Sequence, residues 1–204
     1  MLTLDHIVVA APSLAEGVAH VRDLTGLDMP KGGEHPHMGT HNHLLRLGSD
    51  TFLEVIAVNP DAPAPDRPRW FGLDAPVPQP RLAHWVVRCD DMAKARALLP
   101  DTLGPALSLT RGSLNWLLTV PDDGQLPMDG ALPSLLEWQA DPLPPTQMAG
   151  ADADLTAFTI THPQADMIHE TLAPHLDDPR ITYRTGPLAL EARITVDGRE
   201  VILR

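Results

Sequence analysis

The feature that most constrains the fold is an internal repeat. Residues 4–9 read Leu-Asp-His-Ile-Val-Val and residues 82–87 read Leu-Ala-His-Trp-Val-Val, so a short apolar run with histidine at its third position recurs. A weaker echo, Leu-Thr-Ala-Phe-Thr-Ile, begins at Leu155 and lacks the histidine. Each run is followed by a helix signal, such as the capping box from Ser13 to Glu16, and then by strand-like segments. The sequence therefore predicts three copies of a strand-helix-three-strand unit.

The strands expected after each helix are bounded by turn signals such as Asp197-Gly198. They cover 41–48 and 51–57 in the first unit, about 105–110, 113–120 and 134–139 in the second, and 181–184, 188–196 and 200–203 in the third. We expect an α+β fold in which two βαβββ units, 1–58 and 82–140, pair into a curved mixed sheet around a cavity. Together they would form a body over 1–140, and residues 150–204 would form a third βαβββ-like unit.

A proline-rich stretch separates the first two units. Residues 59–81 hold seven of the 22 prolines, which disfavour helices and central strands, so we expect an extended linker. Inside it, Arg69-Trp-Phe-Gly-Leu73 is unusually apolar. This segment either anchors the linker on the body or forms an aromatic wall of a pocket.

Charge and cysteine content limit the classes of partner and the compartment expected for this chain. The net charge is −12, and only two of the fifteen basic residues are lysines, so we expect neither nucleic-acid nor membrane binding. We find no secretory signal and no apolar run long enough to span a bilayer. The single Cys89 cannot form an internal disulfide and suits a reducing compartment. We therefore expect a cytoplasmic protein that binds neither nucleic acid nor a membrane.

Two glutamates interrupt strands that are otherwise apolar. They are Glu54 in Phe52-Leu-Glu-Val-Ile56 and Glu137 in Leu135-Leu-Glu-Trp138, and a buried unpaired carboxylate would cost several kcal/mol. The first strands of the same two units carry His6 and His84. Two imidazoles and two carboxylates suit a divalent ion such as Fe²⁺, Mn²⁺, Ni²⁺, Co²⁺ or Zn²⁺. Alternatively, the histidines are satisfied core residues and the glutamates lie on an open sheet face.

Four of the ten histidines crowd into residues 35–43. This segment could hold a second metal, could lie at the mouth of a pocket with His41 or Asn42 touching a ligand, or could be a solvated loop. Phe52 is expected in the apolar lining, because alternation places it on the same strand face as Glu54.

Three further residues are assigned by strand alternation. Either Asn115 or Trp116 is expected to face the cavity, and Asn115 is the candidate for ligand binding. Trp138 follows Glu137 directly, so the same alternation turns it away from the proposed site, and Trp85 is turned away beside His84.

Several of these segments resemble a known family. Leu4-Asp-His-Ile-Val-Val-Ala-Ala-Pro12, His35-Pro-His-Met-Gly-Thr-His-Asn42, Phe52-Leu-Glu-Val-Ile56 and Arg69-Trp-Phe-Gly-Leu-Asp74 resemble the glyoxalase-like domain proteins of bacteria, within the vicinal oxygen chelate superfamily. The resemblance covers residues 1–140 by motif and 150–204 by repeat pattern alone.

The resemblance implies a site and a chemistry. His6, Glu54, His84 and Glu137 match the positions that hold a divalent metal in metal-bearing relatives. The metal would chelate adjacent oxygens of a small substrate, and Glu54 or Glu137 would act as base in isomerase, lyase or dioxygenase chemistry. The alternative is a protein that binds a small molecule in the same cavity without turnover. The third unit, which lacks a partner unit, would pack on the first two or pair with its copy in a homodimer.

Overall fold

The computed structural model describes residues 1–150 and 152–204, and its elements follow the repeat. The first unit contains β1 (Thr3–Ala10), α1 (Leu14–Thr25), β2 (Lys31–His35), β3 (Thr40–Leu47) and β4 (Thr51–Val58). The second contains β5 (Arg81–Arg88), α2 (Met92–Arg96), β6 (Ala106–Arg111), β7 (Leu114–Thr119) and β8 (Ser134–Trp138). The third contains β9 (Ala153–His162), α4 (Ala165–Leu172), β10 (Ile181–Thr185), β11 (Ala189–Val196) and β12 (Arg199–Leu203). The predicted order of strand, helix and three strands is confirmed in all three units, although β2 was not among the segments expected in the first.

Short helical segments occupy the connections. The turns η1 (Trp70–Gly72), η2 (Asp101–Leu103) and η3 (Pro127–Gly130) are 3-10 helices, and α3 (Pro144–Gln147) lies between β8 and β9. Among the described residues, no helix combines the length and apolar character needed to cross a membrane.

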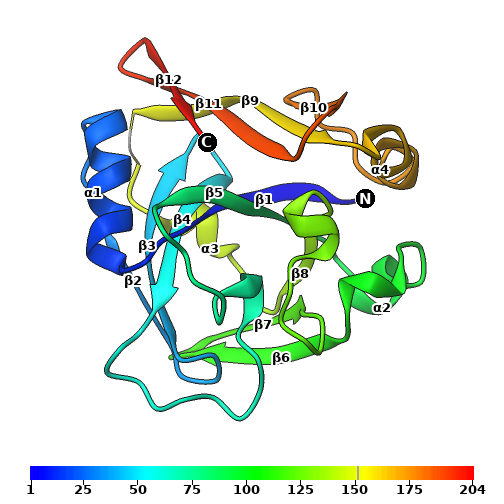
Figure 1. Cartoon of the computed structure of the whole chain (residues 1–204), viewed down its shortest axis with the longest axis horizontal. Helices are drawn as coiled ribbons and strands as arrows, with labels where there is room; N and C mark the ends of the chain where they lie inside the picture. The colour runs from blue at the N-terminus through cyan, green and yellow to red at the C-terminus, as the bar shows by residue number, and fades with distance from the viewer. Residues whose placement is uncertain (151) are drawn as a thin grey trace.

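The first two units form one eight-stranded sheet with two similar halves. Its strand order is β2-β3-β4-β1-β5-β8-β7-β6, with β1 and β5 antiparallel at the centre. In each half the first strand of the unit runs parallel to the last, β1 with β4 and β5 with β8. The sheet curls until β2 approaches β6 (Figure 1). The predicted curved mixed sheet around a cavity is therefore confirmed.

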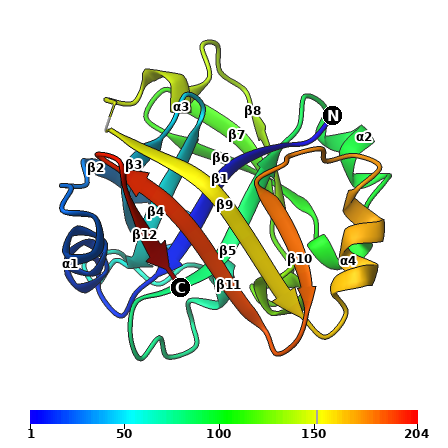
Figure 2. The same cartoon turned by 90° about the horizontal axis from the view of Figure 1, so that it is seen from above.

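The third unit keeps the order of elements but arranges its strands differently. Its sheet has the order β10-β9-β11-β12, so β9 pairs with β10 and β11 rather than with β12. This sheet lies across the outside of the large one (Figures 1 and 2). Phe158 of β9 packs on Trp85 of β5, with ring centroids 5.6 Å apart. The third unit thus packs on the first two, whereas the homodimer and the division into separate domains stay predictions; residue 151, within the expected third unit, lies outside the described residues.

The two faces of the large sheet have separate apolar clusters. Ile7, Val9 and Trp85 belong to the cluster that also contains the third sheet, whereas Val8 and Val86 belong to the cluster on the concave face. Alternation along the strands therefore places side chains as predicted over most of β1 and β5.

A β-bulge breaks this alternation at the start of β1. The pairing with β5 passes from Leu4 directly to His6, so Asp5 has no partner across the ladder. As a result, Leu4 joins the outer cluster, although uninterrupted alternation along the strand would place it on the face of His6. The bulge also allows Asp5 and His6, neighbours in the chain, to contact one another, which shapes the site described next.

Candidate active site

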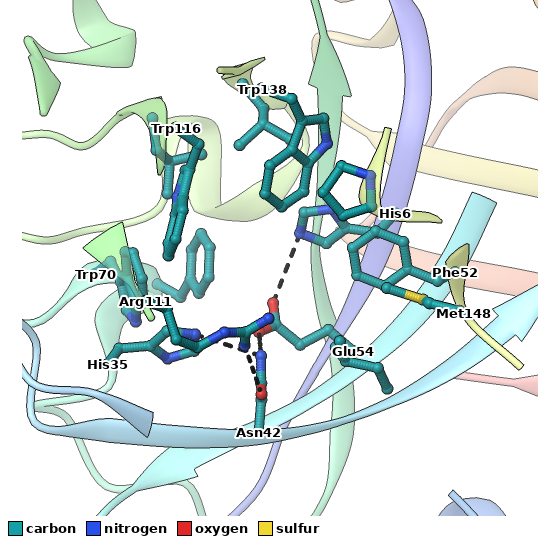
Figure 3. A pocket seen from close by; sticks show the side chains of 15 residues that line it. His6, His35, Asn42, Phe52, Glu54, Trp70, Arg111, Trp116, Trp138 and Met148 are labelled. Atoms are coloured by element: carbon teal, nitrogen blue, oxygen red, sulfur yellow. Dashed lines mark hydrogen bonds and ion pairs between the residues drawn. The ribbon is translucent and has the colours of Figure 1, made fainter. Parts of the chain in front are cut away.

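A pocket opens on the concave face of the large sheet. The space between its walls that atoms do not fill, counting the part open to solvent, is about 520 Å³. Strands of both units contribute to it, as do η1 in the first linker and the segment around α3 (Figure 3). Its lining consists of His6, His35, Asn42, Leu44, Phe52, Glu54, Trp70, Phe71, Arg111, Trp116, Leu118, Leu136, Trp138, Pro144 and Met148.

Asp5, His6 and Glu54 form a line of polar groups that ends in the pocket. Asp5 is fully buried, and its Oδ1 lies 2.7 Å from Nδ1 of His6. On the other side of the ring, Nε2 of His6 lies 3.6 Å from Oε2 of Glu54 (Figure 3). The second oxygen of Asp5 accepts a hydrogen bond from the Trp138 indole at 2.9 Å. Since Asp5 accepts the Nδ1 proton, the Nε2 atom of His6 is directed at Glu54.

Asn42 of β3 holds the other oxygen of Glu54. Its amide nitrogen donates to Oε1 of Glu54 at 2.6 Å and lies 3.4 Å from Nε2 of His35. Its amide oxygen accepts from the backbone N–H of Gly33 at 2.8 Å and from Arg111 at 3.3 Å. These contacts fix the orientation of the Asn42 amide and, through it, that of the Glu54 carboxylate.

Aromatic side chains form the walls. Phe52 stacks on His6 at 4.4 Å between ring centroids, and Trp116 packs on Trp138 at 5.8 Å. From the linker, Trp70 and Phe71 stack on one another at 5.4 Å. The linker segment is thus a pocket wall as well as an anchor, which resolves the alternatives left open by the sequence.

Burial keeps two histidines near the site neutral. It lowers the pKa of His35 to about 3, with the charge of Arg111 acting in the same direction. Burial likewise lowers the pKa of His84 to about 3. Neither ring carries a proton charge at neutral pH, so both act as neutral hydrogen-bonding groups.

The structure brings together part of the predicted site. His6, Glu54, Asn42 and Phe52 line one pocket. His84 lies behind the wall, 5.3 Å from Phe71 between ring centroids and 2.9 Å from Ser134 Oγ.

Three further predicted residues, besides His84, lie outside the pocket. Glu137 points away from it, because its Oε2 accepts a hydrogen bond from the backbone N–H of Met92 at the start of α2. His41 is not among the lining residues, and Asn115 is exposed while its neighbour Trp116 faces in. Trp138 lines the pocket, so the expectation that it turns away is wrong.

The expected four metal ligands therefore do not converge. His6 and Glu54 face each other, whereas His84 and Glu137 are engaged elsewhere. Within the described residues, no three His, Cys, Asp or Glu side chains are placed to hold a metal ion. Zinc sites use at least three protein ligands, so the described side chains of the pocket do not fit a resident zinc ion.

Several residues in or behind the pocket were not predicted from the sequence. His35 stood out only as one of a crowded group of histidines, and Asp5 and Arg111 gave no signal at all. The apolar positions of β8 that face inward, Leu136 and Trp138, flank the glutamate that drew attention. Their orientation depends on how β8 pairs with β5 and β7, and the sequence of β8 alone does not determine this pairing.

Comparison with known proteins finds a family model and a solved structure that match most of this chain. The family model described as a glyoxalase-like domain matches residues 4–176. A hypothetical protein from Staphylococcus aureus has a similar structure, with a TM-score of 0.59, 11% identity, and coverage of 99% of this chain and 84% of that chain.

Methylmalonyl-CoA epimerases also match. A variant from Streptomyces coelicolor has a TM-score of 0.46 and 19% identity, covering 69% of this chain and 100% of that chain. The enzyme from Mycobacterium tuberculosis has a TM-score of 0.45 and 16% identity, covering 68% and 88%. The search of curated proteins gave no match.

Proposed function

Because the chain belongs to the glyoxalase-like domain family of the vicinal oxygen chelate superfamily, we propose that its pocket is an active site for proton transfer on a small organic molecule. The observation that carries this proposal is the Glu54–His6 pair, a carboxylate and an imidazole 3.6 Å apart on the floor of an aromatic pocket. The reaction class is isomerase or lyase chemistry that begins with loss of a proton beside a carbonyl group.

Glu54 is the base in this proposal. Asn42 occupies its Oε1, which leaves Oε2 to face His6 and the cavity. A carboxylate in a site with little water is well placed to remove a proton from carbon, since a bound substrate excludes the remaining solvent.

His6 is the partner that receives or returns the proton. Asp5 accepts the Nδ1 proton of its ring and would stabilise the imidazolium that forms when Nε2 takes up a second proton. Phe52 stacked on the ring prevents it from rotating away from Glu54. The pair can therefore remove a proton at one carbon and supply one to the intermediate, with Asp5 behind it to stabilise the charged ring.

Binding without turnover is the second candidate function. Ten of the fifteen lining residues are apolar or aromatic, so the pocket would also suit a protein that only sequesters an apolar ligand.

Deuterium exchange distinguishes the two functions without knowledge of the product. We would incubate the protein in D₂O with 2-oxo acids, 2-hydroxy ketones and aliphatic thioesters, and follow the C–H signal beside the carbonyl by NMR against a buffer blank. Wild type is expected to exchange at least one class faster than buffer, and Glu54→Gln is expected to lose this activity. Glu34→Gln, an equivalent change at an exposed site on β2, is the control and should retain it.

Three outcomes would each contradict a different part of this proposal. Exchange that persists in Glu54→Gln would remove Glu54 as the base. Ligand binding without exchange of any class would favour the sequestering function. Loss of exchange on treatment with a chelator, with recovery on adding a divalent ion, would contradict chemistry carried by Glu54 and His6 alone.

A further inference from the structure

The pocket continues outward into an open vestibule, formed by the start of β2, the β6–β7 turn and the segment 139–149. The pocket and the vestibule share the side chains of Leu44, Arg111, Pro144 and Met148. A ligand that reaches Glu54 from solvent through the vestibule therefore passes Arg111.

Arg111, the last residue of β6, has no carboxylate partner. Its guanidinium donates to Oδ1 of Asn42 at 3.3 Å, and it takes part in none of the ion pairs found within residues 1–150 and 152–204. Arg69, Arg88 and Arg180, which are also partly buried, each have an aspartate partner.

The position of Arg111 is closely fitted. A Cβ atom at Gly33 would lie 2.7 Å from Cδ of Arg111, so the glycine of β2 makes room for the arginine stem. Burial lowers the pKa of the guanidinium, and the negative charge of Glu54 opposes this effect. Guanidinium stays protonated in proteins, so the chain keeps a half-buried, incompletely paired cation at this point.

Positive charge also gathers at the vestibule in a chain of net charge −12. Lys31 is exposed there, whereas the guanidinium of Arg46 donates to backbone carbonyls of Gly48, Ser49 and Met148 and so serves the structure. Asp141 is the acidic residue of this lining. The cation free to receive a ligand at the boundary is therefore Arg111, with Lys31 beside the entrance.

We propose that the substrate carries an oxyanion, a carboxylate or a phosphate, that binds Arg111 where the vestibule meets the pocket, while its apolar part lies among the tryptophans. A planar guanidinium with free donors matches such groups in geometry as well as in charge. That this anion is a substrate rests on the proposed function, but its binding to Arg111 does not depend on turnover. Arg111 would lie between the oxyanion and Glu54 and so reduce the repulsion between them.

Tryptophan fluorescence reports on the binding directly. Three of the four tryptophans, Trp70, Trp116 and Trp138, line the pocket. We would titrate wild type with matched pairs of probes, phenylacetate against phenylacetamide, hexanoate against hexanamide, and phenyl phosphate against phenol. Each pair differs chiefly in the anionic group, and the carboxylate and phosphate arms separate the two sources of the oxyanion.

We expect the anion of at least one pair to bind wild type roughly tenfold or more tightly than its neutral partner, as a charge-assisted hydrogen bond implies. Arg111→Gln should remove this preference while neutral probes bind as before. Arg184→Gln, which removes the same charge from an exposed position on β10, should keep it. Equal binding of anion and neutral partner, no response to any anion, or an unchanged preference in Arg111→Gln would each overturn the proposal.

These results are separable from those on catalysis. Anion binding that depends on Arg111, without deuterium exchange in any substrate class, would retain the oxyanion site and remove the enzyme proposal. Deuterium exchange that depends on Glu54, without a preference for anions, would retain the enzyme proposal and remove the oxyanion site.

Discussion

Two buried histidines make the stability of this protein depend on pH. Burial lowers the pKa values of His35 and His84 to about 3, whereas a histidine in an unfolded chain titrates near 6.5. Between pH 3 and pH 6.5 the unfolded chain binds protons at these two histidines and the folded chain does not, so acid favours unfolding. The stability is fully retained above pH 6.5 and is lost progressively as the pH falls from 6.5 towards 3.

The size of the effect follows from the same values. For a group that titrates at 6.5 unfolded and near 3 folded, lowering the pH from 7 to 5 costs about 2 kcal/mol. The two histidines together therefore account for a loss of about 4 kcal/mol, a large share of the 5–15 kcal/mol typical of a folded domain.

Urea unfolding at several pH values between 7 and 5, followed by tryptophan fluorescence, measures this loss. His35→Gln and His84→Gln should each reduce the loss by about 2 kcal/mol, because each removes one group that binds a proton only when unfolded. His37→Gln, in the exposed turn between β2 and β3, is the control and should not change it. Since the substitutions also alter stability at pH 7, the comparison is of the dependence on pH. A dependence as steep in both variants as in wild type would refute the reasoning.

Three further predictions concern other parts of the chain. Glu137→Ala should cost about 1–2 kcal/mol, because it removes the hydrogen bond to Met92 at the start of α2, and should leave deuterium exchange intact; loss of exchange would contradict its position outside the pocket. Phe158→Ala should lower the free energy of unfolding by about 3–5 kcal/mol in a single urea transition, because it opens a cavity against Trp85, and two transitions would show that the third unit unfolds separately. Burial raises the pKa of the Cys89 thiol to about 11, so iodoacetamide at pH 7.5 should alkylate it slowly when folded and rapidly in urea, and equal rates would refute this.

The sequence was informative about the fold because its signals are local. The apolar runs, capping residues and turn dipeptides predicted the order of elements in all three units, including β11 and β12 within one residue. Among the strands described by the structure, the short β2, which contains two glycines and little apolar character, was missed, and the short helices in the connections were not predicted. The strand order of the third sheet was not predictable, because the choice of β10 as the neighbour of β9 is made by contacts distant in the chain.

The site was predictable in part. Glu54 was singled out as a carboxylate in an apolar strand, His6 by its recurrence in the repeat and Asn42 by its place in the histidine-rich segment, and all three line the pocket. In β8 the run Leu135-Leu136-Glu137-Trp138 has apolar residues on both faces, so alternation cannot say which set turns inward. The glutamate was chosen by analogy with Glu54, and pairing with β7 instead directs Trp138 to the pocket. Asp5 escaped notice because only the bulge turns it towards His6.

The two paired units contribute different kinds of side chain to the pocket. The first contributes the polar side chains of His6, Asn42 and Glu54, whereas the second contributes the indole rings of Trp116 and Trp138 together with the guanidinium of Arg111. Such a division would let a laboratory library change which ligand the pocket accepts while His6 and Glu54 stay unchanged. Positions 116 and 138 are therefore the natural starting points for redirecting this scaffold to new ligands.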